Sequence, residues 1–170
     1  YLTGIHADRG VACADCHMPY IKEGGQKFTS HRITSPLENI SGTCQVCHRE
    51  REETLRENVY ERQEKVKEIR DKAEIELVKA HVESKAAWDA GATEAEMAPV
   101  LKHIRYSQWY WDYTSASHGA SFHSPIEVSR LIGNAINEAK EARILLARGL
   151  AFHGKNQPIS YPDIATKAAA

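Results

Sequence analysis

The sequence contains the pattern Cys-x-x-Cys-His twice, at residues 13–17 and 44–48, and these two motifs hold all four of its cysteines. Two thiols three positions apart can form thioether bonds to the two vinyl groups of one porphyrin, and the His that follows then ligates the iron. The repeated pattern therefore predicts two covalently attached haems of the c type. The expected attachment residues and proximal iron ligands are Cys13, Cys16 and His17 for one haem and Cys44, Cys47 and His48 for the other.

Three other functions of the cysteines are compatible with Cys-x-x-Cys spacing: a zinc site, a redox pair and structural disulfides. Two Cys-x-x-Cys pairs can form a Cys₄ zinc site, but zinc does not require a His after each second cysteine. A thioredoxin-like redox pair needs a βαβ context, and the sequence shows no such pattern. Two structural disulfides would leave both histidines unexplained. Haem accounts for the whole pattern, and zinc is its main competitor.

The remaining histidines indicate how the second axial position of each iron is filled. The chain has nine His but only two Met, Met18 and Met97, so ligation by two histidines is favoured over ligation by His and Met. Iron held by two histidines has no open position, which suits electron relay and not the activation of a small molecule. Seven histidines are candidates for the distal role: His6, His31, His81, His103, His118, His123 and His153.

Charge and hydropathy exclude two classes of protein. Lys and Arg number 22 against 23 Asp and Glu, a net charge of −1, so no nucleic-acid partner is expected. Mean hydropathy is −0.52 and no run of 18 apolar residues occurs, so no transmembrane helix is predicted. The chain opens at Tyr1 with neither an initiator Met nor a signal-peptide pattern, and we therefore expect a mature, processed or fragmentary chain.

The chain changes character near residue 49. Residues 1–48 hold both motifs, recurring turn signals and little hydrophobic periodicity, so they cannot form much core from their own side chains. Two porphyrins would supply the missing apolar surface. We therefore expect a loop-rich dihaem-binding region at 1–48, a long-helix region at 49–154 and an extended tail at 155–170. Together they make a single domain with an all-α multihaem cytochrome fold, in which haem-wrapping loops are followed by long helices.

The first predicted helix is unusually long. Apolar side chains recur at intervals of 3, 4 or 7 residues from Leu55 to Ala87 within a densely charged stretch, and Gly91 is expected to end the helix. Such a helix is about 60 Å long at about 1.5 Å per residue. It therefore needs a partner along part of its length.

Capping signals predict two further helices. Thr93 and Glu96 form a predicted capping box, and Pro99 is expected to start the second helix. Residues 124–127 form another predicted box, with Pro125 at the first helical position of the third helix. No strand pattern is apparent.

Beyond the two motifs, several short segments occur in the order in which one known family has them. From Tyr1 to about Leu150 the chain closely resembles the C-terminal half of pentahaem cytochrome c nitrite reductases, which form ammonium. A lone Cys-x-x-Cys-His would be weak support, whereas this ordered set is specific. The segments are GIH at 4–6, CADCHMP at 13–19, TSHRI at 29–33, AGATEAEM at 90–97, QWYWD at 108–112 and ASHG at 116–119.

The resemblance implies a role for particular histidines. The first and second motifs match the family's fourth and fifth haems. His6 matches the distal ligand of the fifth haem, and His123 matches that of the fourth. His31 matches a distal ligand of the family's second haem, whose attachment motif is not in this sequence. Histidines without an implied role, expected to be structural or exposed, are His81, His103, His118 and His153, although His118 is near enough to His123 in sequence to be its rival.

The resemblance also implies an activity for the whole enzyme. The family reduces nitrite to ammonium with six electrons in the periplasm, as a homodimer supplied by a membrane-anchored multihaem quinol dehydrogenase. Its lysine-ligated active-site haem, the residues around nitrite and the calcium site all precede Tyr1 in the family's order. We therefore expect an electron-relay and dimerisation portion with two haems c and no catalytic residue. Further haems and calcium are expected in the upstream part of the full enzyme.

Two alternatives remain open. The chain could be a non-enzymatic multihaem c-type electron-transfer cytochrome, although a small carrier needs neither a third distal His nor such long helices. It could also be part of a related octahaem nitrite, tetrathionate or hydroxylamine reductase. A Cys-x-x-Cys-Lys motif upstream of Tyr1 would favour the pentahaem nitrite reductase.

Overall fold

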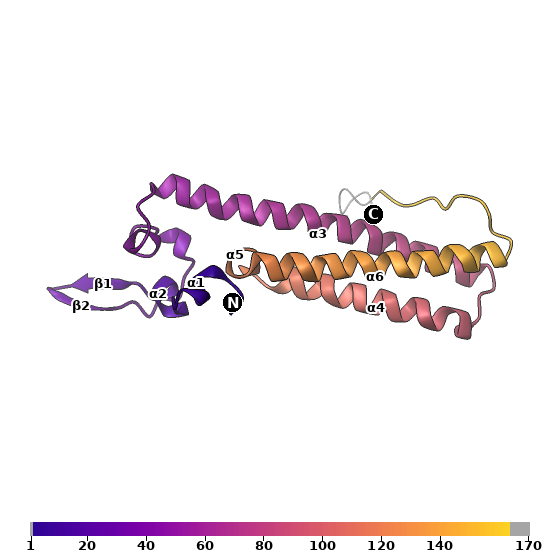
Figure 1. The fold of residues 1–170 in the computed structure, drawn as a ribbon, viewed down its shortest axis with the longest axis horizontal. Helices are drawn as coiled ribbons and strands as arrows, with labels where there is room; N and C mark the ends of the chain where they lie inside the picture. Colours follow the sequence, from indigo (N-terminus) through magenta and orange to yellow (C-terminus); the bar gives the residue numbers. More distant parts are fainter. Residues whose placement is uncertain (1, 164–170) are drawn as a thin grey trace. The chain divides into compact units, whose positions relative to one another are not determined.

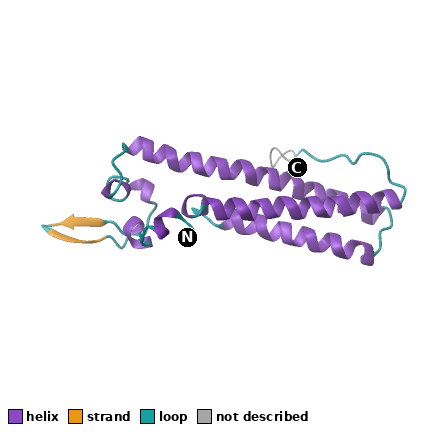
Figure 2. Ribbon diagram, in the orientation of Figure 1, coloured by secondary structure: helices purple, strands orange, loops and turns teal. Residues whose placement is uncertain are grey.

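The computed structural model describes residues 2–163 of the 170, and it is mostly helical, which confirms the all-α fold class (Figures 1 and 2). One small antiparallel hairpin interrupts the helices. In chain order the elements are α1 (Ile5–Asp8), α2 (Cys13–His17), β1 (Tyr20–Glu23), β2 (Gln26–Thr29), the 3₁₀ turns η1 (Pro36–Glu38) and η2 (Cys44–Val46), α3 (Glu52–Asp89), α4 (Glu94–Ala116), α5 (Ala120–His123) and α6 (Pro125–Phe152).

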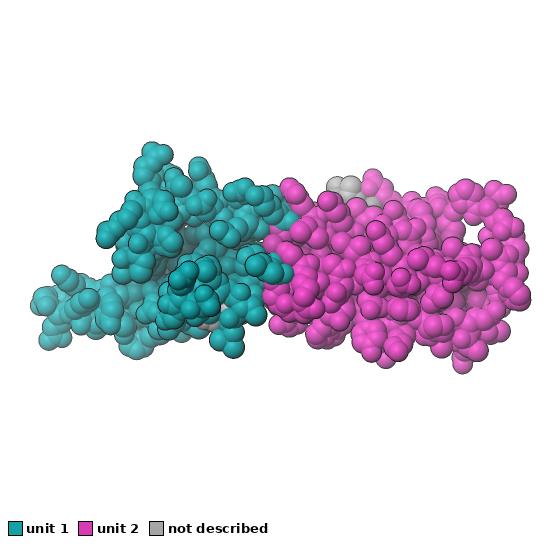
Figure 3. Space-filling view, viewed as in Figure 1, with its two compact units in different colours: residues 1–65, 119–126 teal, residues 66–118, 127–170 magenta. Residues whose placement is uncertain are grey.

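The chain divides into two compact units, which Figure 3 colours separately. We call the first the motif unit, which consists of Tyr1–Lys65 and Gly119–Ile126. The second, the bundle unit, consists of Val66–His118 and Glu127–Ala170. Both Cys-x-x-Cys-His motifs belong to the motif unit, together with α5. The first boundary falls inside α3, so this helix contributes residues to both units.

The core of the bundle unit forms where the second half of α3 packs with α4 and α6 (Figure 1). The apolar stripe predicted along α3 is buried at Val66 and from Ala73 onward, whereas its members Leu55, Val59 and Ile69 are only half-buried. The long helix thus has the partner that its length requires. The core side chains are Leu77, Ala80 and Ala87 from α3, Met97, Val100 and Ile104 from α4, and Ala142, Leu146 and Leu150 from α6.

Small side chains allow α4 and α6 to approach each other closely. Ala135 and Ala139 of α6 are fully buried, and the buried hydroxyl of Ser107 on α4 donates a hydrogen bond to the Ala135 carbonyl over 2.8 Å. His103 of α4 also lies 2.7 Å from the Glu138 carboxylate of α6. These contacts give His103 a structural role, as expected from the sequence.

The start of α4 confirms one prediction and corrects another. Thr93 and Glu96 form the predicted capping box, in which the Glu96 carboxylate accepts the Thr93 backbone N–H over 2.7 Å. Since Thr93 is the cap, the helix begins at Glu94, and the prediction that Pro99 starts it is wrong. Pro99 lies inside α4 instead, in its second turn, where its missing N–H costs one backbone hydrogen bond.

The start of α6 also differs from the prediction. Pro125 is its first residue, as expected, but the capping box at 124–127 is wrong. The Ser124 hydroxyl is hydrogen-bonded to the hydroxyl of Thr3, and the Glu127 carboxylate binds the Arg130 guanidinium at 2.6 and 2.8 Å. Each side chain of the expected box has therefore found a different partner.

A β-hairpin, not predicted from the sequence, follows the first motif. Strands β1 and β2 pair antiparallel, with Tyr20 opposite Thr29 and Glu23 opposite Gln26. Gly24 and Gly25 connect them, and both have positive φ, 53° and 88°. In a two-residue hairpin loop, positive φ at both residues gives a turn whose twist matches that of the flanking strands. Glycine is favoured at these positions because it adopts positive φ readily. Gly24 and Gly25 are among the turn signals of residues 1–48, whereas the strands beside them were not predicted.

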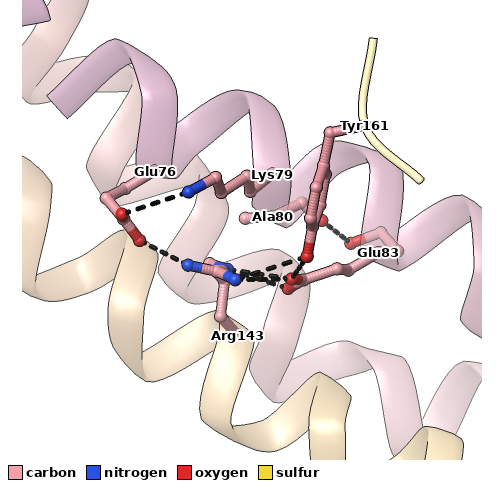
Figure 4. A network of polar contacts seen from close by, with 7 residues as sticks. Glu76, Lys79, Ala80, Glu83, Arg143 and Tyr161 are labelled. Atoms are coloured by element: carbon pink, nitrogen blue, oxygen red, sulfur yellow. Dashed lines mark hydrogen bonds and ion pairs between the residues drawn. The ribbon is translucent and has the colours of Figure 1, made fainter. Parts of the chain in front are cut away.

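A polar network holds part of the C-terminal segment against α3 and α6 (Figure 4). The Arg143 guanidinium of α6 binds the Glu76 carboxylate over 2.6 Å and the buried Glu83 carboxylate over 2.9 Å. The Tyr161 hydroxyl donates a 2.5 Å hydrogen bond to Glu83. Residues 155–163 have no regular secondary structure, and the remainder of the predicted tail, 164–170, lies outside the described residues. No helix within residues 2–163 is long and apolar enough to cross a membrane.

Candidate functional site

Both cysteine motifs begin in short helical turns of the motif unit. The first coincides with α2, so Cys13 and Cys16 lie one helical turn apart on the same side. The Asp15 carboxylate accepts the N–H of Ala12 over 2.7 Å and thereby caps this turn. The second motif begins in η2, directly after the buried Thr43. All four thiols are free, and Cys13 and Cys47 are exposed, so the motifs have the accessibility that covalent attachment requires.

The first motif histidine is paired with a residue from the other segment of the motif unit. The ring centroid of His17 lies 6.0 Å from that of His123, with an angle of 63° between the ring planes. His118, the rival considered for this position, is exposed and belongs to the bundle unit. The pair therefore combines the predicted proximal ligand of the first motif with the distal ligand implied by the resemblance.

The second motif histidine is paired in the same way. The ring centroid of His48 lies 6.1 Å from that of His6, and the planes make an angle of 74°. Here too one histidine follows a Cys-x-x-Cys pair and the other is the distal ligand expected for that haem. The structure thus brings four of the five predicted ligands into two pairs.

The separation within each pair can be compared with that of two imidazoles on one metal ion. A metal–imidazole bond is about 2 Å long, and a five-membered ring with bonds of about 1.33 Å has its centre roughly 1.1 Å from each atom. Two imidazoles on opposite sides of one metal therefore have centroids about 6 Å apart. Both pairs have this separation, so the residues present fit an iron bound between two histidines.

Hydrogen bonding orients the two motif histidines differently. Nδ1 of His17 lies 3.0 Å from the Thr34 carbonyl, which can only accept a hydrogen bond, so Nδ1 carries the proton. Nε2 then has the free lone pair that ligates a metal. Nδ1 of His48 lies instead 3.7 Å from the Glu50 carboxylate. The first histidine therefore faces a neutral acceptor, and the second faces a negative charge.

The surroundings of the two distal histidines favour their neutral form. Burial lowers the pKa of His6, and the nearby His48 lowers it further. Burial likewise lowers the pKa of His123, with His17 as the next cause. An imidazole must be neutral to bind a metal, so both shifts favour ligation. Burial raises the pKa of the Cys16 thiol, and the charge of Cys44 adds to this effect.

A glycine turn positions His123. Gly119 precedes α5 with φ +76°, a conformation that other residues rarely adopt. A Cβ atom at this position would lie 3.2 Å from Cε1 of His123, closer than most side chains tolerate. Glycine thus serves both the backbone turn and the approach of the His123 ring.

The motif unit has very little core of its own. Among its described residues, Ile40 is the only buried hydrophobic side chain. Apolar side chains near the motifs remain exposed, including Ile5, Ile33 and Val46. Burial of apolar surface is the main source of favourable folding free energy. The motif unit buries little apolar surface, so its own side chains contribute little of this free energy. The expectation that a bound group supplies the missing apolar surface agrees with this arrangement.

The remaining candidate residues are exposed or have other partners. His31 is exposed in the irregular segment after β2. His81 is exposed on α3, and Nε2 of His153 lies 3.3 Å from the Glu96 carboxylate without forming a hydrogen bond. Trp109 stacks on Tyr113 on the exposed side of α4 in the bundle unit. Within residues 2–163, no three His, Cys, Asp or Glu side chains converge as metal ligands.

Sequence reasoning did not identify every residue of this site. Phe122 contacts the rings of both His6 and His123, and Thr3 is hydrogen-bonded to Ser124 beside His123. Phe122 is adjacent to a candidate ligand in sequence, which was the only available signal. Nothing in the sequence pattern pointed to Thr3, because its partner is 121 residues away.

Comparison with known proteins gives consistent results. The family model described as Cytochrome c552 matches residues 1–170. Relatives named cytochrome c-552 include those of Porphyromonas gingivalis (60% identical) and Bacteroides fragilis (57%), each aligned over 167 residues. The alignments cover 98% of this chain but 34% of each relative, so the chain spans about a third of their length.

A solved structure shares the fold. The catalytic subunit NrfA of the cytochrome c nitrite reductase from Desulfovibrio desulfuricans ATCC 27774 aligns with a TM-score of 0.80 and 31% identity. The alignment covers 93% of this chain and 35% of that one. That structure was described with regard to its two calcium sites.

Proposed function

Because the chain belongs to the cytochrome c552 family, we propose that it is the electron-relay and dimerisation portion of a multihaem nitrite reductase that forms ammonium. The observation that carries the proposal is the pairing of each motif histidine with a second histidine at 6.0 or 6.1 Å. The sequence relatives and the nitrite reductase fold support the same function. The proposed position within the enzyme is its C-terminal portion.

The proposed site residues hold two haems c. Cys13 and Cys16 attach one haem, with His17 and His123 as its axial ligands. The other haem is attached and ligated by Cys44, Cys47, His48 and His6. Each haem supplies one-electron transfer when bound. With both axial positions filled by histidine, these residues leave no open position for nitrite, which is why we assign them to relay and assign no catalytic residue to this chain.

His31 has a separate proposed role. Two motif histidines already have partners at 6.0 and 6.1 Å, so His31 is left over as a distal ligand. It is exposed in the motif unit, where another part of the enzyme can reach it. We assign it to a haem attached outside this sequence. This surplus ligand favours a larger enzyme over a small electron carrier.

The properties of the whole enzyme follow from the family. The full enzyme would reduce nitrite to ammonium with six electrons, at a further haem that this sequence does not attach. Calcium, which is named for the Desulfovibrio protein, would bind in the part of the full enzyme outside this sequence, as the family resemblance implies. In the alternative of a related octahaem reductase, this chain would have the same relay role. The reaction at the haem attached outside this sequence would differ.

The proposed cellular context is periplasmic. Attachment of c-type haem and electron supply by a membrane-anchored multihaem quinol dehydrogenase both agree with this location. The proposed homodimer would use the long helices α3 and α6, on which apolar side chains such as Ile75 and Ile144 remain exposed. No nucleic-acid partner is proposed, because the net charge of −1 offers no excess of basic residues.

Haem content and nitrite turnover test this proposal. The chain, produced in a host that attaches c-type haem, should have a mass about 1.2 kDa above that of the polypeptide, as two haems of about 0.6 kDa each require. A pyridine haemochrome spectrum should show thioether-linked haem. The protein at its full natural length should convert nitrite to ammonium with reduced viologen. Stoichiometric zinc without haem in the chain would refute the haem assignment. If the chain carries two haems but the full-length protein does not reduce nitrite, the electron-carrier alternative is favoured.

A further inference from the structure

Phe122 contacts both of the proposed distal histidines. Its ring is stacked on that of His6, with a centroid separation of 5.5 Å and an interplanar angle of 29°. Its edge-to-face contact with His123 has a separation of 6.2 Å and an angle of 65°. Both separations lie in the range over which aromatic rings attract each other. One half-buried phenyl ring therefore lies between two imidazoles that belong to different haem sites.

We propose that Phe122 is a positioning residue shared by the two distal histidines, so that one side chain fixes the ring orientation at both haems. The inference rests on the proposed function, because it takes His6 and His123 as iron ligands. Phe122 itself touches no iron in this arrangement and is not a ligand. It acts by restricting how the two imidazole rings can turn.

The need for such a residue follows from the surroundings of the two ligands. His6 lies in α1, a helix of four residues without a buried side chain, and His123 ends α5, which is equally short. Neither short helix can hold its histidine rigidly by packing of its own. A ring that contacts both imidazoles supplies this restriction, because turning either histidine would break an aromatic contact.

A hydrogen bond beside Phe122 reinforces the same alignment. The hydroxyls of Thr3, three residues before His6, and of Ser124, next to His123, are bonded to each other. Ser124 is buried and Thr3 is exposed, so this bond is partly shielded from competition by water. Together with Phe122 it joins the α1 segment to the α5 segment. The two distal histidines therefore move as one assembly and not independently.

The sequence offers a matched control. Phe152 and His153 repeat the dipeptide Phe122–His123 in the bundle unit, and their rings are 5.3 Å apart at 90°. Phe152 is 80% exposed and belongs to the other unit from the proposed distal ligands, and its ring contacts that of His153. Replacing Phe152 by Leu removes a phenyl ring next to a histidine without affecting the proposed assembly.

The test uses the haem-loaded protein at its full natural length with Phe122→Leu, Phe122→Met and Phe122→Tyr. Leu and Met retain apolar bulk but remove the ring, whereas Tyr retains the ring. Electron paramagnetic resonance reports the orientation of axial imidazoles, and the rate of cyanide binding to the oxidised protein reports how readily a distal ligand leaves. His6→Ala and His123→Ala identify the signal of each haem, since each removes one ligand.

We expect Phe122→Leu and Phe122→Met to change the low-spin signals of both haems and to speed cyanide binding at both by several-fold. Phe122→Tyr should resemble the unsubstituted protein, and Phe152→Leu should change neither signal. If either Phe122→Leu or Phe122→Met loses haem, the spectra and cyanide-binding rates of the other variant provide the test. A change at one haem or at none would overturn the inference, provided that His6→Ala and His123→Ala each alter one signal. If those two variants leave the spectra unchanged, the ligand assignment itself fails.

Discussion

The rings of His17 and His123 lie 6.0 Å apart, although one ends the first Cys-x-x-Cys-His motif and the other ends α5, more than 100 residues later. The pair is held from both sides. The Thr34 carbonyl fixes the tautomer of His17, and Gly119 allows the close approach of His123. A haem iron between them would be closed to other ligands, and this arrangement is the basis of the relay role.

Removing His123 should open one haem and leave the other unchanged. In His123→Ala only the distal bond of the haem at Cys13 and Cys16 is lost, while the thioethers and His17 remain. Absorption spectra should show about one high-spin haem in place of a low-spin one, with unchanged haem content. The control is His118→Ala, which should keep the low-spin spectrum. If the control opens a haem and His123→Ala does not, His118 is the ligand.

Gly119→Ala should disturb the same haem by a different route. Both Gly119 and Gly154 have positive φ, 76° and 73°, so alanine at either position costs roughly 1–2 kcal/mol of backbone strain. Only at Gly119 would the new Cβ press on the His123 ring, at 3.2 Å. Gly154→Ala is therefore the matched control. Thermal unfolding should shift similarly in both variants, whereas the low-spin resonance signal should change only in Gly119→Ala. Identical spectra would contradict the positioning role of Gly119.

The capping box of α4 should make part of the stability depend on pH. Hydrogen bonds from the Thr93 backbone and then its side chain lower the pKa of Glu96 from 4.5. A carboxylate whose pKa falls on folding contributes stability above its unfolded pKa, and this contribution is lost as the pH falls through the folded value. Below pH 4.5 the stability should therefore decline, and less steeply in Glu96→Gln. Urea unfolding at several pH values measures this difference.

The cap residue itself allows a separate test. Thr93→Ala should cost about 1 kcal/mol of unfolding free energy at neutral pH, since the first turn of α4 loses a side-chain acceptor. The hydroxyl accepts the Glu96 N–H over 3.3 Å. Thr93→Ser retains this acceptor and should restore most of the loss. Equal destabilisation by both variants would show that the methyl group, and not the cap, is responsible.

Arg143 should matter more to stability than an exposed arginine does. Arg143→Met would leave the carboxylate of Glu83, which is 6% exposed, without its cation, and the expected cost is about 3 kcal/mol. Arg130 pairs with Glu127 at 2.6 Å on the surface, so Arg130→Met should cost less than about 1 kcal/mol. Chemical denaturation of both variants gives the comparison. A restored stability in the double variant Arg143→Met with Glu83→Leu would identify the unpaired charge as the cause.

The isolated 170-residue chain should not reduce nitrite, even when it carries both haems. Two histidines close each iron in the proposed assignment, and nitrite has no position to bind. The assay is ammonium formation with reduced viologen, with the protein at its full natural length as the positive control. Sustained turnover by the isolated chain would mean that one of the two haems has an open axial position.

The local chemistry of the chain could be predicted from sequence because it depends on neighbouring residues. Five consecutive residues define each haem-attachment motif, and hydrophobic periodicity from Leu55 to Ala87 predicted the 38-residue helix α3. The Thr93 box likewise requires residues only three positions apart. By contrast, the hairpin at β1 and β2 was missed because its strands are four residues long and mostly exposed, which leaves no hydrophobic alternation to detect.

The site as a whole depends on contacts between distant segments. Residue chemistry alone left seven candidate distal histidines, and family resemblance selected His6 and His123 from them. The ring separations of 6.0 and 6.1 Å and the place of Phe122 between the two distal ligands appear only in the folded chain. Ser124 illustrates the reason. Its sequence predicts a helix cap, yet its hydroxyl is bonded to Thr3, because packing decides which of two competing partners a polar side chain meets.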